Sequence, residues 1–229
     1  MELQEIMLII LCFAGVIVQG FYILSEVKQK MLAAVILKGI ASATFVTVGV
    51  VGMYGTAGGT LPGLILCGLI LGALGDVLLN ARYFAGKGEP AMFVAGVVSF
   101  FLGHVMYLIV LMSVSQSRMP VIITAAVLSA VIICIMQRTI TASVPMKILG
   151  GVYVTAVVLM ATAAVGNALS VPGTGRILFA VGAVLFLSSD LILIFNTFGE
   201  RTKMLWSAIC LALYYPGQLL IALAIYFGL

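Results

Sequence analysis

The length and composition of the chain exclude most classes of soluble protein. It has 229 residues, of which 64% are hydrophobic and only 8% are charged. Soluble domains carry about 25% charged residues, so we exclude a soluble enzyme. The same hydrophobicity excludes intrinsic disorder. The net charge of +4 is spread over scattered residues and forms no basic patch, so no nucleic-acid partner is expected.

Apolar runs between polar, glycine or proline residues predict eight transmembrane helices, each near the ~20 residues that a bilayer requires. In chain order the predicted spans are 6–24, 31–54, 61–80, 91–112, 119–137, 147–168, 174–196 and 203–227. The runs are continuous and do not alternate, which favours helices over the strands of a membrane barrel. Because eight spans leave only short connections, we expect a single all-α transmembrane domain over residues 1–229.

The distribution of lysine and arginine predicts the orientation of the helices. Nine of these residues lie in or beside the connections after the first, third, fifth and seventh spans: Lys28, Lys30, Lys38, Arg82, Lys87, Arg138, Lys147, Arg201 and Lys203. Only Arg118 and Arg176 lie at the other end. Positively charged connections stay in the cytoplasm, so both termini are predicted to lie outside. We expect an integral, multi-pass protein of a bacterial inner or plasma membrane rather than of an organelle.

The sequence also indicates an internal repeat. A shift of 114 residues places Asp76 on Asp190 and the segment 100–104 (FFLGH) on 214–218 (YYPGQ). Chance similarity between apolar segments is the alternative explanation. Each half would hold four spans, so the two halves would be parallel and related by an axis along the membrane normal. The halves would cover about residues 1–115 and 116–229.

Asp76 and Asp190 are the only acidic residues inside the predicted spans. A charge at the centre of a membrane helix costs about 2.5–3.5 kcal/mol even on the mildest scale, so both should face a bundle interior or a wet cavity. Lys38 enters from the same side, and Asn80 lies one turn beyond Asp76 on its face. We therefore expect a shared polar pocket that opens toward the cytoplasm. The alternatives are a structural ion pair with Lys38, a hydrogen bond between helices, and extension of Lys38 to the membrane surface.

A second set of polar side chains is predicted nearer the middle of the membrane. His104 and Tyr107 are three residues apart and share one helix face. Tyr214 and Gln218 are four residues apart and share another. Tyr153 joins them from the sixth span. Hydrogen bonding between helices is the alternative role for the histidine, and packing is the alternative for the tyrosines.

Cysteine and histidine give no sign of a metal centre. The four cysteines each lie inside an apolar run, and the chain has a single histidine. None of the cysteines has the CxxC spacing of a zinc site, so we expect no metal ligand.

Four short motifs combine these polar residues with a fixed spacing: 71–79 (LGALGDVLL), 103–107 (GHVMY), 188–191 (SSDL) and 214–218 (YYPGQ). In this order they resemble the GDxxL, HxxY, SD and YYxxQ motifs of the YhhN family of integral membrane proteins. Lys38, Tyr153 and Met160 also fall where the family has the same residue types. The resemblance covers nearly the whole chain.

The resemblance implies the activity of a lysoplasmalogenase, because the characterised members are of that kind. Such an enzyme hydrolyses the vinyl-ether bond of a lysophospholipid to a fatty aldehyde and a glycerophospho-ethanolamine or -choline. It implies Asp76 and Asp190 as catalytic residues and needs no cofactor. The implied substrate-binding residues are Lys38, Asn80, His104, Tyr107, Tyr153, Ser189, Tyr214, Tyr215 and Gln218. Lys38 would meet the phosphate, and the lipid tail would remain in the bilayer.

Two carboxyl groups suit this chemistry. An acid protonates the β-carbon of the vinyl ether, and water captures the resulting oxocarbenium ion. Glycosidases treat a similar cation with one protonated and one ionised carboxyl group. Which aspartate is the acid stays open at this point. A proton-coupled transporter of a small molecule or lipid is the alternative, because it also uses intramembrane aspartates and repeated halves; a structural or lipid-binding protein would need neither aspartate for chemistry.

Overall fold

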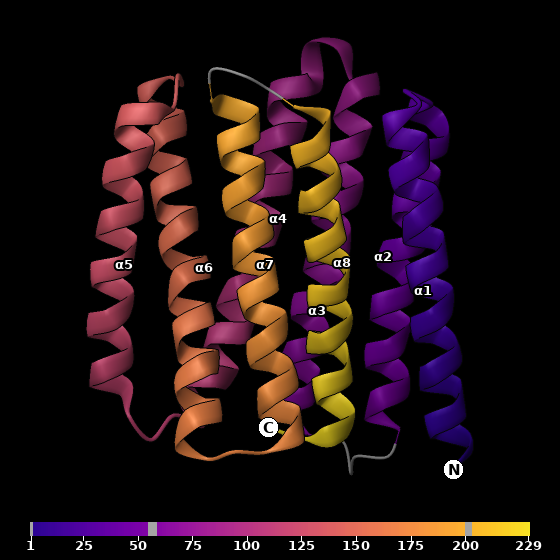
Figure 1. The fold of residues 1–229 in the computed structure, drawn as a ribbon, viewed down its shortest axis with the longest axis vertical. Coiled ribbons are helices and arrows are strands. Elements are labelled where there is room, and N and C mark those ends of the chain that lie inside the picture. Colours follow the sequence, from indigo (N-terminus) through magenta and orange to yellow (C-terminus); the bar gives the residue numbers. More distant parts are fainter. Residues whose placement is uncertain (1, 55–58, 200–202) are drawn as a thin grey trace.

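The structure is a computed structural model that describes residues 2–54, 59–199 and 203–229. Eight long helices make up this part of the chain, with two short 3-10 helices, η1 (Arg82–Phe84) and η2 (Gly86–Gly88), between the third and fourth (Figure 1). The long helices are α1 (Leu3–Val27), α2 (Met31–Met53), α3 (Thr60–Ala81), α4 (Glu89–Ser113), α5 (Arg118–Thr139), α6 (Val144–Ser170), α7 (Thr174–Phe198) and α8 (Met204–Phe227). The described residues contain no strand. All eight predicted helices are confirmed, with ends that differ by at most three residues.

Each helix is long and apolar enough to cross a membrane. The shortest have 22 residues, which at 1.5 Å per residue give about 33 Å. Large apolar side chains such as Phe13 and Leu128 point outward, and the outer helices α1 and α5 are the least buried. Such a surface would aggregate in water but suits contact with lipid tails. The eight helices therefore fit a multi-pass membrane protein.

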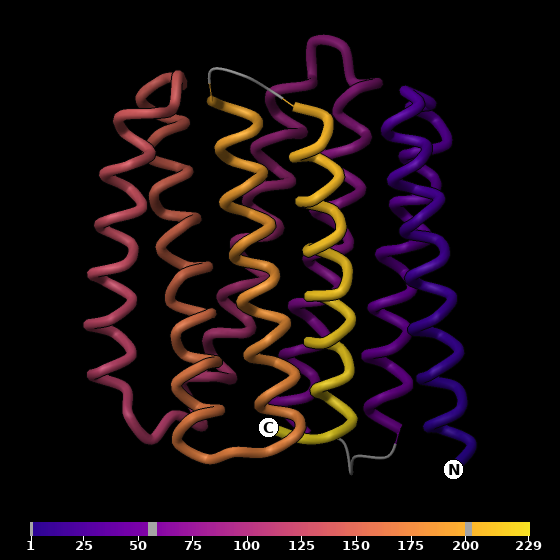
Figure 2. Tube along the Cα trace, in the orientation of Figure 1, coloured from indigo at the N-terminus to yellow at the C-terminus, as the bar shows by residue number. Residues whose placement is uncertain are grey.

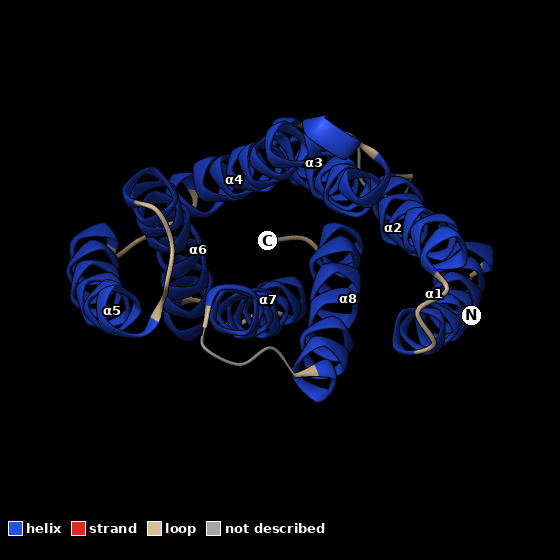
Figure 3. Ribbon diagram, turned by 90° about the horizontal axis from the view of Figure 1, so that it is seen from above, coloured by secondary structure: helices blue, strands red, loops and turns tan. Residues whose placement is uncertain are grey.

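Six helices form a closed ring of contacts in the order α2, α3, α4, α6, α7 and α8. Helix α1 packs outside the ring on α2, and α5 packs outside on α6 (Figure 3). Successive helices alternate in direction, so both termini lie at one end of the bundle (Figure 2). The last residues of α1, α3, α5 and α7 lie at the opposite end, which is the end predicted to be cytoplasmic. The orientation in the membrane stays a prediction from charge.

Close glycine contacts hold matching helix pairs together. A Cβ atom on Gly182 of α7 would lie 2.6 Å from the carbonyl oxygen of Gly217 on α8. A Cβ atom on Gly103 of α4 would lie 3.0 Å from the carbonyl oxygen of Gly68 on α3. Only glycine permits this approach between helix backbones. The two pairs are separated by the same 114 residues as the two aspartates, which is the pattern that a parallel repeat would give.

Candidate functional site

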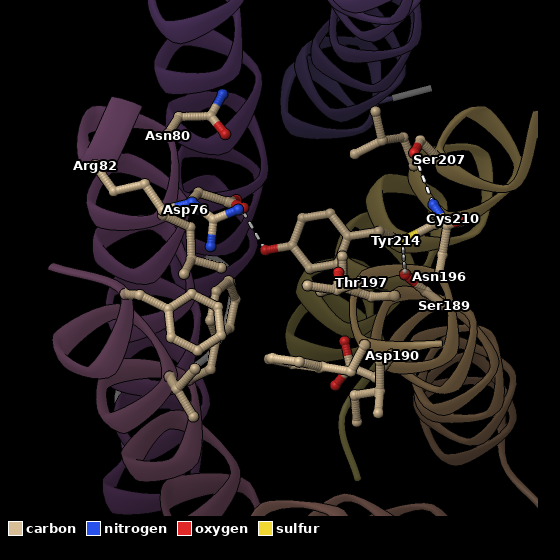
Figure 4. Close-up of a pocket in the computed structure, with 18 of the residues that line it drawn as sticks. Asp76, Asn80, Arg82, Ser189, Asp190, Asn196, Thr197, Ser207, Cys210 and Tyr214 are labelled. Atoms are coloured by element: carbon tan, nitrogen blue, oxygen red, sulfur yellow. Dashed lines mark hydrogen bonds between the residues drawn. The ribbon is translucent and has the colours of Figure 1, made fainter. Parts of the chain in front are cut away.

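Both intramembrane aspartates line one cavity of about 380 Å³ inside the helix ring. Asp76 reaches it from α3, and Asp190 reaches it from α7 (Figure 4). Each aspartate is at least 94% buried, since the exposed fractions are 2% and 6%. The lining extends to η1 and to the last residues of α7, so the cavity lies toward the end that is predicted to be cytoplasmic.

Asp76 is surrounded by polar partners from two other helices, α2 and α8. The Lys38 ammonium group lies 3.2 Å from Asp76 Oδ1 and also donates to Asn80 Oδ1 at 3.3 Å. The hydroxyl groups of Ser42 and Tyr214 donate to Asp76 Oδ2 at 2.6 and 2.8 Å. Figure 4 shows the bond from Tyr214 crossing from α8 to α3. A cation and two hydroxyl donors together stabilise an ionised carboxylate in a site that water hardly reaches.

Lys38 does not extend to the membrane surface, which was one of the alternatives raised by the sequence. Its residue is only 8% exposed, and its ammonium group points inward to Asp76 and Asn80. The ion pair between Lys38 and Asp76, which was another of the alternatives, is present. Because Asp76 also lines the cavity, the ion pair is part of the cavity wall.

Asp190 has much simpler surroundings. The Tyr153 hydroxyl donates to Asp190 Oδ2 at 2.5 Å, and the same hydroxyl lies 3.3 Å from His104 Nε2. Within the described residues, no lysine or arginine forms an ion pair with Asp190. The polar chain from Asp190 through Tyr153 to His104 therefore carries no compensating cation in this structure.

The 114-residue shift that places Asp76 on Asp190 does not preserve the surroundings of Asp76. On α4 the residue 114 positions before Tyr214 is Phe100, which has no hydroxyl group. The residues 114 positions after Lys38 and Asn80 are Val152 and Ile194, which are both apolar. The bond to Asp190 comes instead from Tyr153, which is next to Val152 on α6 and is neutral.

Four of the residues expected to contact substrate do not line the cavity: His104, Tyr107, Tyr215 and Gln218. They form a layer behind the wall, deeper in the membrane. Gln218 donates to the Tyr214 hydroxyl at 3.3 Å and accepts from the Tyr107 hydroxyl at 3.4 Å. The remaining five of the expected residues line the cavity: Lys38, Asn80, Tyr153, Ser189 and Tyr214.

Several residues around the aspartates had not been expected. Ser42, which donates to Asp76, is a serine in an apolar span, and Arg82, which lines the cavity, is a charge at a helix end, so neither carries a sequence signal. Cys210 faces the cavity and lies 3.2 Å from the Ser189 hydroxyl. Asn196 lines the cavity too and accepts a hydrogen bond from the backbone of Lys203 at 2.8 Å. The rarity of acids inside apolar spans therefore predicted Asp76 and Asp190, whereas these neighbours are found only in the structure.

Comparison with known proteins gives one match. The model of the YhhN family matches residues 29–225, which is most of the chain. The chain belongs to the YhhN family. The matched segment runs from the start of α2 to within two residues of the end of α8. It contains every site residue described above. No curated protein and no solved structure gave a significant match.

The side chains of this YhhN protein offer no cluster of the usual metal ligands within the described residues. The described residues hold no group of three or more His, Cys, Asp or Glu side chains that could bind a metal ion. His104, which is the single histidine, is surrounded by aromatic rings, with its ring centroid 4.8 Å from that of Phe186. The arrangement provides carboxyl, hydroxyl and ammonium groups, which suit acid–base chemistry.

Proposed function

We propose that this protein hydrolyses the vinyl-ether bond of lysoplasmalogens, releasing a fatty aldehyde and a glycerophospho-ethanolamine or -choline. The observation that carries the proposal is the unequal pair of carboxyl groups in one cavity. Asp76 has a cation beside it, whereas Asp190 has only the Tyr153 hydroxyl. Family membership supports the same conclusion.

The unequal surroundings favour different roles for the two aspartates. A buried carboxyl group without a cation is more stable when it is protonated, so Asp190 is the proton donor. Its Oδ2 atom accepts from Tyr153 in either form, which leaves Oδ1 to carry the proton. Asp76 stays ionised beside Lys38 and stabilises positive charge in the cavity.

The reaction proceeds in three steps. Asp190 transfers its proton to the β-carbon of the vinyl ether, which leaves an oxocarbenium ion whose charge Asp76 offsets. Water then attacks the cationic carbon and returns a proton to Asp190, giving a hemiacetal. The hemiacetal breaks into the aldehyde and the free hydroxyl of the glycerophospholipid. Asp190 regains its proton, so the reaction consumes only the substrate and one water molecule.

The cavity also fits an amphiphilic substrate. Its lining combines polar residues such as Asp76, Asn80 and Ser189 with apolar residues such as Phe93 and Leu193. A single-chain lysolipid likewise combines a polar headgroup with an apolar tail.

The test is aldehyde release by the purified protein from a lysoplasmalogen in neutral detergent. The control substrate is the matching lysolipid with a saturated ether, which has no double bond to protonate. We expect aldehyde from the first and none from the second. A folded protein that releases no aldehyde would refute the proposal. Transport of lysolipid into vesicles without any product would support the alternative raised by the sequence.

A further inference from the structure

Arg82 is a cationic lining residue that has no ion pair with either aspartate. It lies at the start of η1, directly after α3, and lines the same cavity as Asp76 (Figure 4). The Lys38–Asp76 pair is the ion pair found among the described residues, so no acid neutralises Arg82 in this structure. An uncompensated guanidinium at a cavity wall is an attractive place for an anion.

The Arg82 side chain is held in a fixed position. Its guanidinium carbon lies 5.0 Å from the centre of the Tyr83 ring and 5.0 Å from that of Phe93. Nη2 donates to the Tyr83 hydroxyl at 3.2 Å, whereas the buried Nε atom has no hydrogen-bond partner. Two aromatic contacts thus orient the group and leave donors unused. Arginine with free donors is well suited to bidentate binding of a phosphate.

Lys38, which the sequence assigns to the phosphate, is already occupied. Its ammonium group serves Asp76 and Asn80, and an anion beside it would compete with the ion pair. Arg82 is free of that conflict. Its place in η1, beyond the end of α3, also puts it nearer than Lys38 to the membrane surface, where a phospholipid headgroup lies.

We propose that Arg82 binds the phosphodiester of a single-chain phospholipid and so holds the headgroup at the mouth of the cavity. The inference rests on the proposed function in one respect, because it takes the ligand to be the lysolipid substrate. Glu26, near the end of α1, lines the same cavity and provides the opposite charge. One cation and one anion there match a zwitterionic headgroup, whose ammonium group Glu26 attracts.

The experiment measures binding with ligands that cannot be hydrolysed. The probes are a saturated 1-alkyl-glycerophosphoethanolamine and the 1-alkylglycerol of equal chain length, titrated into the full-length protein in neutral detergent. A charged hydrogen bond of the usual strength predicts that the wild type binds the phosphorylated probe about 10- to 100-fold more tightly. Arg82→Gln should lose most of this preference, and Arg82→Lys should keep part of it.

Lys87→Gln is the matched control, because Lys87 is a cation of the same connection that is exposed and does not line the cavity. It should keep the wild-type preference. Arg82→Gln with an unchanged preference, or a wild type that binds both probes equally, would overturn the assignment. Inorganic phosphate is the third probe, and binding of phosphate as tight as that of the lipid would assign Arg82 to free phosphate instead.

The outcome is independent of catalysis, since neither probe has a vinyl ether. A protein that shows the Arg82-dependent preference but releases no aldehyde would support the headgroup site and refute the hydrolase. A protein that releases aldehyde but shows no preference for the phosphorylated probe would support the hydrolase and refute the headgroup site. For an active protein, Arg82→Gln should also raise KM by a similar factor while kcat changes little, because Arg82 is assigned to the headgroup and not to the bond that breaks.

Discussion

Replacing each aspartate by asparagine should separate the two roles in stability as well as in activity. Asparagine keeps the size of the side chain and still accepts hydrogen bonds, but it can neither carry charge nor donate an acid proton. General acid–base contributions are typically 10²- to 10⁴-fold, so we expect either variant to lose at least that factor in turnover. The stability of the two variants should differ, because only Asp76 has a cation beside it.

Asp76→Asn leaves the Lys38 ammonium group buried without its counter-charge. Breaking a buried ion pair from one side costs about 3–5 kcal/mol. For a chain of this length, that corresponds to a fall of roughly 6–20 °C in the apparent melting temperature. Asp190→Asn leaves no charge behind and still accepts from Tyr153, so its free energy of unfolding should change by less than about 1 kcal/mol.

The measurement is thermal unfolding of both variants in the same detergent, with turnover expressed per folded molecule. A double variant, Asp76→Asn with Lys38→Met, is the internal control. It removes both charges and should recover much of the lost stability, but none of the activity. The reasoning fails if Asp190→Asn loses as much stability as Asp76→Asn, or if either variant keeps near-normal turnover.

Three further predictions test the site, the packing and the topology. Tyr153→Lys should abolish turnover, because it places a cation beside Asp190 as Lys38 is beside Asp76. Tyr153→Phe should only slow the reaction. Equal initial rates of the two variants would count against Asp190 as the proton donor. Gly182→Ala should lower the melting temperature, because the new Cβ would collide with α8. Gly63→Ala, with no atom within 4 Å of the new Cβ, should not lower it, and equal melting of the two would contradict the packing. A reporter fused after Leu229 should be accessible from outside the cell, and a cytoplasmic signal would reverse the predicted orientation.

The helices and the two acids could be predicted because their sequence signals are local. An apolar run of about 20 residues has few structures open to it, since backbone groups in lipid must bond within the segment. An acid inside such a run has a high cost, so Asp76 and Asp190 stand out without any knowledge of the fold. The structure adds that the ring of six helices brings both aspartates into one cavity.

The neighbours of the acids could not be predicted, because they depend on the rotation of each helix about its axis. Ser42 looks like any small residue that permits helix packing, yet it donates to Asp76 at 2.6 Å. Gln218 shares a helix face with Tyr214, but it lies one turn deeper, behind the wall. Arg82 contributes to the charge bias of its connection, and that explanation concealed its place in the cavity.

An unequal carboxyl pair would have a simple origin in a duplicated bundle. Two identical halves would give both aspartates the same partners, whereas the proposed acid catalysis needs one protonated and one ionised group. Loss of the cation and of the tyrosine hydroxyl from one half would be enough to break that equality. With the shift of 114 residues, Val152 stands opposite Lys38 and Phe100 stands opposite Tyr214, while the aspartates lie on α3 and α7. In a duplicated bundle the repeat would thus supply the geometry of the pair, and the divergence of its halves would supply the proposed chemistry.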